Sequence, residues 1–475
     1  MKMKSIAAVV ILVTVVLGLL LFSIEEPLDQ TPDEAVHSHV LSNGMKVLVI
    51  ENHRAPVVVS QVWYRVGASY EHDGITGVSH VLEHMMFKGT DDHPAGEFSE
   101  IIAANGGDEN AFTGQDYTAY FQKIASDRLE LCLELEADRM RNLLLQESEF
   151  KKEIEVVKEE RRLRTEDRPT SLTYERFNAV AFTNSPYRHP IVGWMEDLES
   201  MTIDDVRNWY QTWYAPNNAT LVVAGDVEAE QVFRLAKQYF SPLPRSPIPP
   251  VKPRREAKQY GTQRLTVELP AKIPYLIMGY KAPVLSRVEE EWEVYALEVL
   301  AGVLDGGDSA RLSRYLVRGQ QIASSASASY GMSAMYETLF VLSAVPNDDV
   351  SIDVLEFALR EQVNRLKTDL ADSDELERVK AQVVAAQVYK QDSVFYQAME
   401  VGMLDSIGLP WQLKDEYVEK ILAVTAEQVR QVANRYLVDT GLTVAVLEPL
   451  PIENHESDTG AQTVTGEVTG EENAQ

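Results

Sequence analysis

Two histidines stand four residues apart in the stretch GVSHVLEHMMFKGT, and a glutamate directly precedes the second one. On a helix over 77–88 with Thr76 as its cap, His80, Glu83 and His84 share one face, because each residue advances by about 100°. Histidines at i and i+4 can hold one metal ion through their ring nitrogens. The glutamate between them can take a proton from a water molecule at that ion. The H-x-x-E-H pattern therefore predicts the core of a metal-dependent hydrolase.

A catalytic zinc ion takes three protein ligands and leaves one position open, so a third ligand must come from elsewhere. The segment SEFKKEIEVVKEERRLRT (148–165) predicts a helix that Ser148 caps. Glu153 and Glu160 fall within or at the edge of its apolar stripe, where carboxylates need compensation. A divalent cation would supply it, and nearby arginines would be the alternative, since Arg164 lies on the same stripe.

The composition excludes several classes of function. The chain has 475 residues, with 44 basic and 73 acidic side chains and a net charge of −29. Phosphate backbones need basic partners, so no nucleic acid is expected as a partner. Cys132 is the only cysteine in the sequence, which excludes an internal disulfide framework and gives no support to a cysteine-based metal site.

The N-terminus predicts export. Lys2 and Lys4 precede the apolar run IAAVVILVTVVLGLLLF at 6–22, so we interpret residues 1–24 as a signal peptide or N-terminal membrane anchor. The polar, acidic segment 25–37 would be a tether. The body of the chain would then be extracytoplasmic (periplasmic), either anchored to the inner membrane or secreted after signal cleavage.

Proline divides the body into two parts. The stretch SPLPRSPIPPVKPRR holds six prolines, which exclude a helix or a central strand. We therefore predict an N-terminal catalytic domain at 38–240, a proline-rich linker at 241–259 and a C-terminal non-catalytic domain at 260–450. The acidic tail at 451–475 has few large apolar residues and is predicted to be disordered.

The two parts also resemble each other. The segments TIDDVRNWYQTWYAPNNATLVVAGDV and TAEQVRQVANRYLVDTGLTVAVLEP both predict a threonine-capped helix, a turn and a strand. Aligning Tyr295 with the first histidine places Glu298 on the glutamate and Val299 on the second histidine. This self-similarity indicates a duplication in which only the first copy keeps metal chemistry.

These stretches together resemble the pitrilysin/insulinase family of zinc peptidases (inverzincins, M16) over about residues 38–449. HVLEH followed by MMFKGT is similar to the active-site helix of the family, and EIEVVKEERRLRTEDRP to its distal glutamate segment. That match implies Glu160 as the third zinc ligand and Glu153 as a supporting glutamate. Further matches are NGGDENAFTGQDYTAYF, SPYRHPIVGW, YAPNNATLVVAGDV and LDGGDSARLSRYL. The length resembles the two-domain type, the bacterial relatives of the mitochondrial processing peptidase.

The resemblance implies an α+β fold with two homologous α/β-sandwich domains. Each would have an antiparallel-rich sheet with helices packed on it, and the two would enclose a clamshell chamber. The substrate would add as a strand to a sheet edge near the metal, which Asn110, Ala111 and Phe112 match. Asn110 would hold the substrate or the edge, and an ordinary turn asparagine is the alternative. The family also implies a homodimer or a heterodimer with an inactive homologue.

We therefore predict a zinc-dependent endopeptidase with one Zn²⁺ per chain. It would hydrolyse unfolded or short polypeptides outside the cytoplasmic membrane, using a zinc-activated water. His80, His84 and Glu160 would hold the zinc, Glu83 would be the general base, and Glu153 would orient a ligand histidine. The alternatives are a non-catalytic scaffold or binding subunit of a peptidase-like complex, and a zinc hydrolase that acts on something other than peptides.

Overall fold

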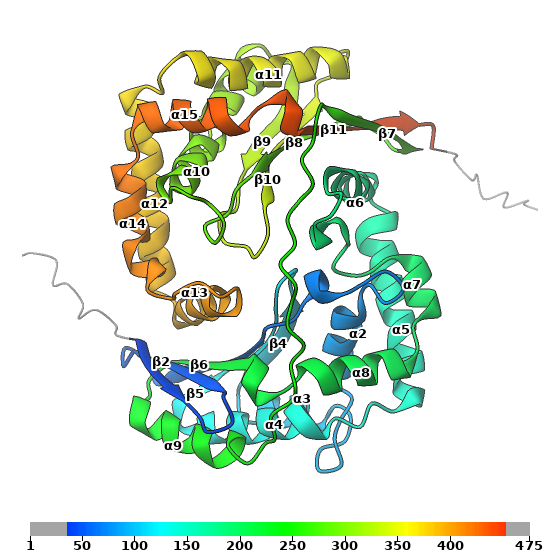
Figure 1. Ribbon diagram of the computed structural model, residues 1–475, viewed down its shortest axis with the longest axis vertical. Helices are drawn as coiled ribbons and strands as arrows, with labels where there is room; N and C mark the ends of the chain where they lie inside the picture. The colour runs from blue at the N-terminus through cyan, green and yellow to red at the C-terminus, as the bar shows by residue number, and fades with distance from the viewer. Residues whose placement is uncertain (1–35, 453–475) are drawn as a thin grey trace, which may run out of the picture.

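The computed structural model describes residues 36–452, so the predicted signal or anchor, nearly all of the tether and residues 453–475 of the tail lie outside the described part. The helices and strands form two halves, from β1 to α9 and from β7 to β11. Residues 241–262 join the halves as a long crossing without helix or strand (Figure 1). Between residues 36 and 452, no helix combines the length and the apolar character that a membrane crossing requires.

The first half is built on a six-stranded sheet in the order β1-β2-β6-β3-β5-β4. Its strands are β1 (Val36–Val40), β2 (Lys46–Glu51), β3 (Val57–Tyr64), β4 (Asp108–Thr113), β5 (Thr118–Ala125) and β6 (Ala219–Gly225). Its α-helices are α2 (Val78–Met85), α3 (Glu97–Ala104), α4 (Leu129–Asn142), α5 (Glu147–Arg161), α6 (Pro169–Ala181), α7 (Met195–Ser200), α8 (Ile203–Trp213) and α9 (Ala229–Phe240).

The second half is built on a five-stranded sheet in the order β7-β11-β8-β10-β9. Its strands are β7 (Gln263–Pro270), β8 (Tyr275–Ala282), β9 (Ala323–Ser329), β10 (Thr338–Pro346) and β11 (Leu442–Leu450). Its α-helices are α10 (Trp292–Asp305), α11 (Ile352–Thr368), α12 (Ser373–Gln391), α13 (Val394–Ser406), α14 (Leu413–Ala423) and α15 (Ala426–Tyr436).

The two sheets have the same topology once β1 is set aside. In each half the first strand pairs in parallel with the last strand of that half, β2 with β6 and β7 with β11, and all other pairs are antiparallel. The helix before each last strand begins with a capping box, at Thr202 in α8 and at Thr425 in α15. The predicted α+β fold with two homologous, antiparallel-rich domains is confirmed.

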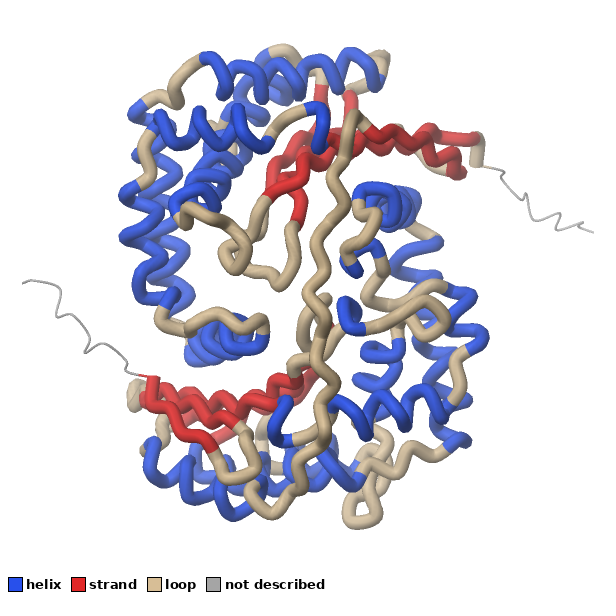
Figure 2. The backbone as a smooth tube through the Cα atoms, in the orientation of Figure 1, coloured by secondary structure: helices blue, strands red, loops and turns tan. Residues whose placement is uncertain are grey.

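In each half, one helix packs against the sheet of the other half (Figures 1 and 2). Helix α13 packs on β3 and β6, and helix α6 packs on β7, β8 and β11. A glycine allows an aromatic ring close contact at both places. A Cβ atom on Gly402 would lie 2.2 Å from the indole nitrogen of Trp63, and one on Gly279 would lie 2.5 Å from Cζ of Phe177. The two halves therefore interlock through reciprocal contacts.

A buried carboxylate strengthens the contact of α13. Asp405 is 5% exposed and accepts hydrogen bonds from Arg65, at 2.8 Å, and from the hydroxyl of Thr220, at 2.7 Å. Lys46 pairs with its other oxygen. Burial raises the pKa of Asp405, but these contacts outweigh burial and hold the pKa below its usual value. The charged form is thus the one that joins the halves.

Candidate metal centre

Helices α2 and α5 pack against each other and bring the predicted ligands together. The Nε2 atom of His84 lies 3.4 Å from Oε2 of Glu160, and the Nε2 atom of His80 lies 3.8 Å from Oε1. One donor atom from each of the three residues lies within 4.8 Å of the others. Two ligands at about 2.0–2.1 Å from a tetrahedral zinc ion stand about 3.4 Å apart. The donor set therefore fits a zinc ion in both chemistry and spacing.

Glu153 lies behind this donor set, and its two carboxylate oxygens contact two different residues. Its Oε2 is 3.3 Å from Nδ1 of His84, and its Oε1 is 2.6 Å from the ammonium of Lys88. The apolar stripe that pointed to Glu153 and Glu160 is present, since Phe150 and Ile154 are buried. Glu153 can therefore fix the orientation of one imidazole without reaching the donor set itself.

Glu83 completes the face that the sequence predicted. The hydroxyl of Thr113, on β4, donates a hydrogen bond to its carboxylate. Burial raises the pKa of Glu83, and this hydrogen bond offsets only part of the rise. Burial lowers the pKa of His80 to about 3, and the electrostatic influence of His84 and Arg164 acts in the same direction. The first imidazole is thus neutral near pH 7, which is the form that binds a metal ion.

The arginine of the alternative interpretation is also present. Nη1 of Arg164 lies 2.6 Å from Oε1 of Glu160. The guanidinium side chain is 74% exposed, whereas the side chain of Glu160 is 17% exposed. One solvated arginine does not account for two imidazole nitrogens that face the same carboxylate, so the geometry favours a metal site with Arg164 at its rim.

The predicted cap of α2 was wrong. The helix begins at Val78, and Gly77 precedes it with a φ of 88°. Glu71 takes the capping role, because its carboxylate accepts hydrogen bonds from the backbone N–H groups of Gly77, at 2.7 Å, and Ser79, at 2.8 Å. Burial raises the pKa of Glu71 to about 7. Sequence reasoning missed this residue because it lies seven positions before the first residue of the helix, across a loop.

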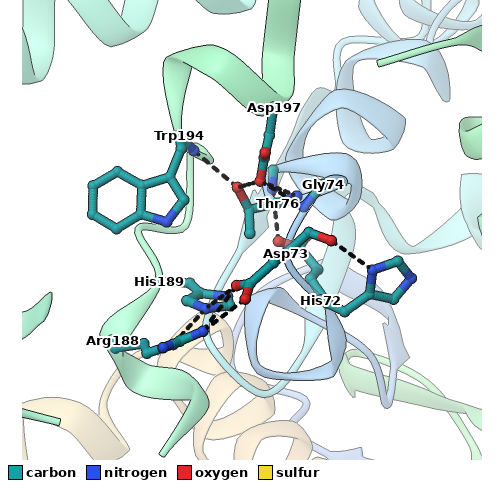
Figure 3. Close-up of polar contacts among 10 residues, drawn as sticks. His72, Asp73, Gly74, Thr76, Arg188, His189, Trp194 and Asp197 are labelled. Carbon is teal, nitrogen blue, oxygen red and sulfur yellow. Dashed lines mark hydrogen bonds and ion pairs between the residues drawn. The ribbon is translucent and has the colours of Figure 1, made fainter. Parts of the chain in front are cut away.

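Thr76 serves a different purpose, in the loop that leads into α2 (Figure 3). Its hydroxyl and backbone N–H donate to Asp197, which also accepts from the N–H of Gly74, at 3.2 Å. The N–H of Trp194 in turn donates to the Thr76 hydroxyl, at 3.0 Å. The loop is therefore tied to Trp194, the last residue of the predicted family motif SPYRHPIVGW, and to Asp197 in α7, which directly follows the motif.

The same segment contacts the loop at two further points. Arg188 forms an ion pair with Asp73, at 2.9 Å, and His189 lies 3.1 Å from the same carboxylate (Figure 3). The backbones meet at Gly77 and Gly193, whose φ angles of 88° and 87° favour glycine. A Cβ atom on Gly193 would lie 2.3 Å from the carbonyl oxygen that precedes Gly77. The motif thus fixes where α2 starts.

The C-terminal end of α5 is also held by buried contacts. Arg161 is 2% exposed and donates to both carboxylate oxygens of Glu175 on α6, at 2.7 and 3.0 Å, and to the carbonyl of Gly193, at 2.8 Å. This anchor directly follows Glu160. Sequence reasoning missed it, since nothing in ERRLR separates a buried arginine from solvated ones. The predicted Ser148 cap was also wrong, because α5 starts one residue earlier and has no side-chain cap.

A cavity of about 920 Å³ opens beside the donor set. Its lining includes His80, Glu83, His84, Glu160, Arg164 and residues 110–113 of β4. Strand β4 is the outer strand of its sheet, so one edge of it is unpaired. Asn110 lies within this strand, which makes the turn alternative wrong. Its side-chain oxygen accepts the N–H of Ala111, at 2.8 Å, and Phe112 packs edge-to-face on Trp63.

The chain is similar to known proteins of one family. The family described as insulinase (peptidase family M16) matches residues 46–193, and the peptidase M16 inactive domain matches residues 200–383. The zinc protease PqqE of Helicobacter pylori is 32% identical in an alignment of 423 residues that covers 87% of this chain and 92% of the relative. The chain belongs to the M16 peptidase family.

A solved structure and a second relative are also similar to this chain over most of its length. A crystal structure of a protease from Helicobacter pylori has a TM-score of 0.83 and 31% identity, and covers 88% of this chain and 100% of its own. A probable mitochondrial-processing peptidase subunit beta of Arabidopsis thaliana is 25% identical in an alignment of 441 residues that covers 88% of this chain and 81% of the relative. The chain is thus a peptidase-family protein of the two-domain type with a candidate metal site.

The second half of this M16 chain lacks an equivalent centre. In the described range 36–452, the group of His80, His84 and Glu160 is the one set of side chains found that could hold a metal ion. Glu298, which aligns with Glu83, instead accepts a hydrogen bond from the hydroxyl of Tyr417.

Proposed function

We propose that this chain is a zinc-dependent endopeptidase that hydrolyses unfolded or short polypeptides. The observation that carries the proposal is the convergence of His80, His84 and Glu160 beside Glu83, at a cavity that an unpaired sheet edge borders. The name of the Helicobacter pylori relative, a zinc protease, supports both the metal and the reaction.

The reacting residues divide the chemistry between them. His80, His84 and Glu160 hold one zinc ion, which when bound polarises a carbonyl group and makes a water molecule more acidic. Glu83 takes the proton from the attacking water and passes it to the leaving amine. Its raised pKa suits this exchange, and the hydroxyl of Thr113 holds its carboxylate in place.

Glu153 is a positioning residue in this proposal. It accepts from Nδ1 of His84, and that contact directs the other ring nitrogen toward the metal. Lys88 balances the charge of Glu153 from the other side.

The unpaired edge of β4 binds the substrate as an added strand. Main-chain pairing grips any extended peptide with little side-chain selectivity, which suits unfolded chains. The N–H of Ala111 is directed away from β5, since the side chain of Asn110 accepts it. Asn110 gives up this contact when a substrate carbonyl takes its place. Phe112 holds the strand against Trp63 while this happens.

We place this activity outside the cytoplasmic membrane. The support is the apolar run at 6–22 behind two lysines, which directs export whether it is cleaved or stays as an anchor. We further propose that the enzyme works as a homodimer or with an inactive homologue, and the support is the name of the Arabidopsis thaliana relative, which is a subunit. The non-catalytic scaffold is the weaker alternative, since the described donor set is complete.

A peptide assay tests the proposal. Purified residues 25–475 are assayed with a quenched fluorogenic peptide, after treatment with a chelator and after return of zinc. We expect cleavage to disappear with the chelator and to return with zinc. Cleavage that survives complete metal removal would exclude the mechanism. Binding of zinc and peptide without any cleavage would instead support the scaffold.

A further inference from the structure

A second cavity, of about 530 Å³, lies between the two halves of the chain. The first half contributes residues from 115 to 187 to its lining, and the second half contributes residues from 329 to 341. Three residues, Gln115, Tyr174 and Asn178, line both this cavity and the cavity at the metal centre. The two spaces therefore adjoin, with these residues at their junction.

The lining of the second cavity is uncharged apart from one buried residue. Five of its residues are aromatic, namely Tyr117, Tyr174, Phe182, Tyr187 and Tyr330. Its one side chain of the Asp, Glu, Lys, Arg or His type is Asp116, which is 4% exposed. The cavity at the metal centre has several charged residues, and the whole chain carries a net charge of −29. An uncharged, aromatic lining favours uncharged side chains as its occupant.

The wall from the second half is fixed to the first half. The backbone N–H of Met335, in the loop between β9 and β10, donates to Asp116 and to the hydroxyl oxygen of Tyr187, each at 3.1 Å. Asp116 also accepts from the hydroxyl of Ser69, at 2.8 Å, and Arg287 donates to the carbonyl of Met335, at 2.6 Å. The cavity is thus a built feature with both walls held in place.

Tyr174 is the aromatic residue at the junction. It lies on α6 and is 45% exposed, although Phe177 on the same helix is buried against the sheet of the second half. Asn178 follows one helical turn later, so both side chains lie on the same part of the helix surface. A peptide that reaches from the metal centre into the second cavity passes over this pair.

We propose that the two cavities form one peptide channel, in which the second cavity takes an apolar or aromatic substrate side chain at a distance from the cleaved bond. Tyr174 is the residue that determines this specificity. The inference rests on the proposed peptidase function, because it treats the metal centre as the place where the peptide is cut. It adds a preference that main-chain pairing on β4 does not supply.

The first experiment measures selectivity with the zinc-loaded protein. A peptide with one cleavage position, found by mass spectrometry, is varied so that each other position in turn carries Phe, Ala or Asp. We expect one position away from the cleaved bond to favour Phe over Asp by on the order of tenfold, mainly through KM. Tyr174→Ala brings that ratio to within about twofold of one and leaves the ratios at other positions unchanged.

Two further variants sharpen this test. Tyr389→Ala removes a tyrosine that is 76% exposed on α12 and lines neither cavity, so it leaves every ratio unchanged. Asn178→Asp places a negative charge at the junction, so the same position then favours Lys over Asp. The proposal is overturned if no distant position is selective, or if Tyr174→Ala slows all peptides equally through kcat.

A binding experiment separates this inference from the proposed function. The Glu83→Gln protein is titrated with a fluorescent Phe-containing peptide and with its Asp-containing counterpart, with and without Tyr174→Ala. Preferential binding of the Phe peptide that depends on Tyr174 supports the channel, even if the wild-type protein cuts no peptide and the proposed function fails. Equal binding of the two peptides contradicts the channel, even if cleavage is observed.

Discussion

The two halves of the chain share one topology but differ in what the equivalent helix presents. Helix α2 has His80, Glu83 and His84 beside a cavity. Helix α10 places Tyr295 and Val299 at the aligned positions of the two histidines, and both are buried, at 1% and 0% exposure. Helix α12 is the second α-helix after β10, as α5 is the second α-helix after β5, and it carries no acidic residue between 378 and 391. The second half therefore lacks all three metal donors.

Both halves have a buried carboxylate between the two aligned positions, Glu83 in the first half and Glu298 in the second. Burial raises the pKa of Glu298 as it raises that of Glu83. The partner differs, because Tyr417 of α14 covers Glu298 while Thr113 of the open edge strand holds Glu83. The fold thus provides a buried carboxylate in both halves. The histidines, the acid on the second helix and the open cavity are found only beside Glu83 among the described residues, and they make the candidate metal centre.

The largest expected effect comes from removing a metal ligand. His84→Ala leaves two of three protein ligands, so we expect zinc after dialysis to fall from about one to below about 0.1 per chain, with no detectable peptide cleavage. The matched change in the second half, Val299→Ala, leaves zinc and activity unchanged and lowers only thermal stability. Atomic absorption and a peptide assay on both variants check this. Full zinc in His84→Ala would contradict the assignment.

The next effect separates metal binding from proton transfer. Glu83→Gln keeps the ligands but loses the base, so we expect about one zinc per chain with kcat lowered by about 10²–10⁴-fold. Glu298→Gln is the same substitution at the aligned position, and we expect its kcat to stay within about twofold of wild type, because no described metal group lies there. Equal losses in the two variants would mean that the carboxylates act only through stability.

A smaller effect on zinc binding is expected from a change at Glu153, which lies behind the ligands. Glu153→Gln removes the charge that faces Nδ1 of His84, so zinc affinity should fall by about 10–100-fold while the site can still be filled at high zinc. Competition with a chromophoric chelator measures the affinity, and peptide cleavage at saturating zinc provides the control. Unchanged affinity would remove Glu153 from its positioning role.

Much of this centre could be predicted from the sequence, because it depends on local periodicity. His80, Glu83 and His84 follow from helical spacing alone, and Glu153 and Glu160 follow from the apolar stripe of α5. The duplicated topology follows from repeated caps and strands. These features could be predicted because each depends on residues that lie within one or two turns of each other.

The supports of the centre could not be predicted, because they depend on long-range contacts. Glu71 caps α2 from across a loop, and Arg161 reaches Glu175 on the next helix. The close approach of Gly77 and Gly193 joins residues more than 100 positions apart. A single sequence shows such residues only as an ordinary acid, arginine or glycine. Local residue preferences alone therefore favour Thr76 and Ser148 as caps.

Glu71 gives a prediction that depends on pH. Its native pKa of about 7 exceeds the ordinary value of 4.5, so between these values the native state binds more protons than the unfolded chain. Its contribution to stability is therefore largest below pH 4.5 and falls as pH rises to 7. Glu71→Gln cannot titrate, so the free energy of unfolding of wild type relative to this variant should fall by up to about 3 kcal/mol from pH 5 to 7.5. Denaturant melts at the two pH values test this, and a constant difference would contradict it.

The reciprocal helix exchange gives the smallest expected effect and asks whether the halves hold each other equally. Gly402→Ala and Gly279→Ala each place a methyl group within 2.5 Å of an aromatic ring, and overpacking of this kind costs about 1–3 kcal/mol. In α13 alanine also has a better helix propensity than glycine, by about 1 kcal/mol, and this gain opposes the clash. The ring of Trp63 cannot move away freely, however, because its indole N–H donates a hydrogen bond to Gln61, at 2.9 Å. We therefore expect both variants to unfold at lower temperature, and Trp63→Phe to restore part of the loss only in Gly402→Ala. If Gly279→Ala alone destabilised the protein, the contact of α6 would hold the halves together and that of α13 would merely cover a sheet.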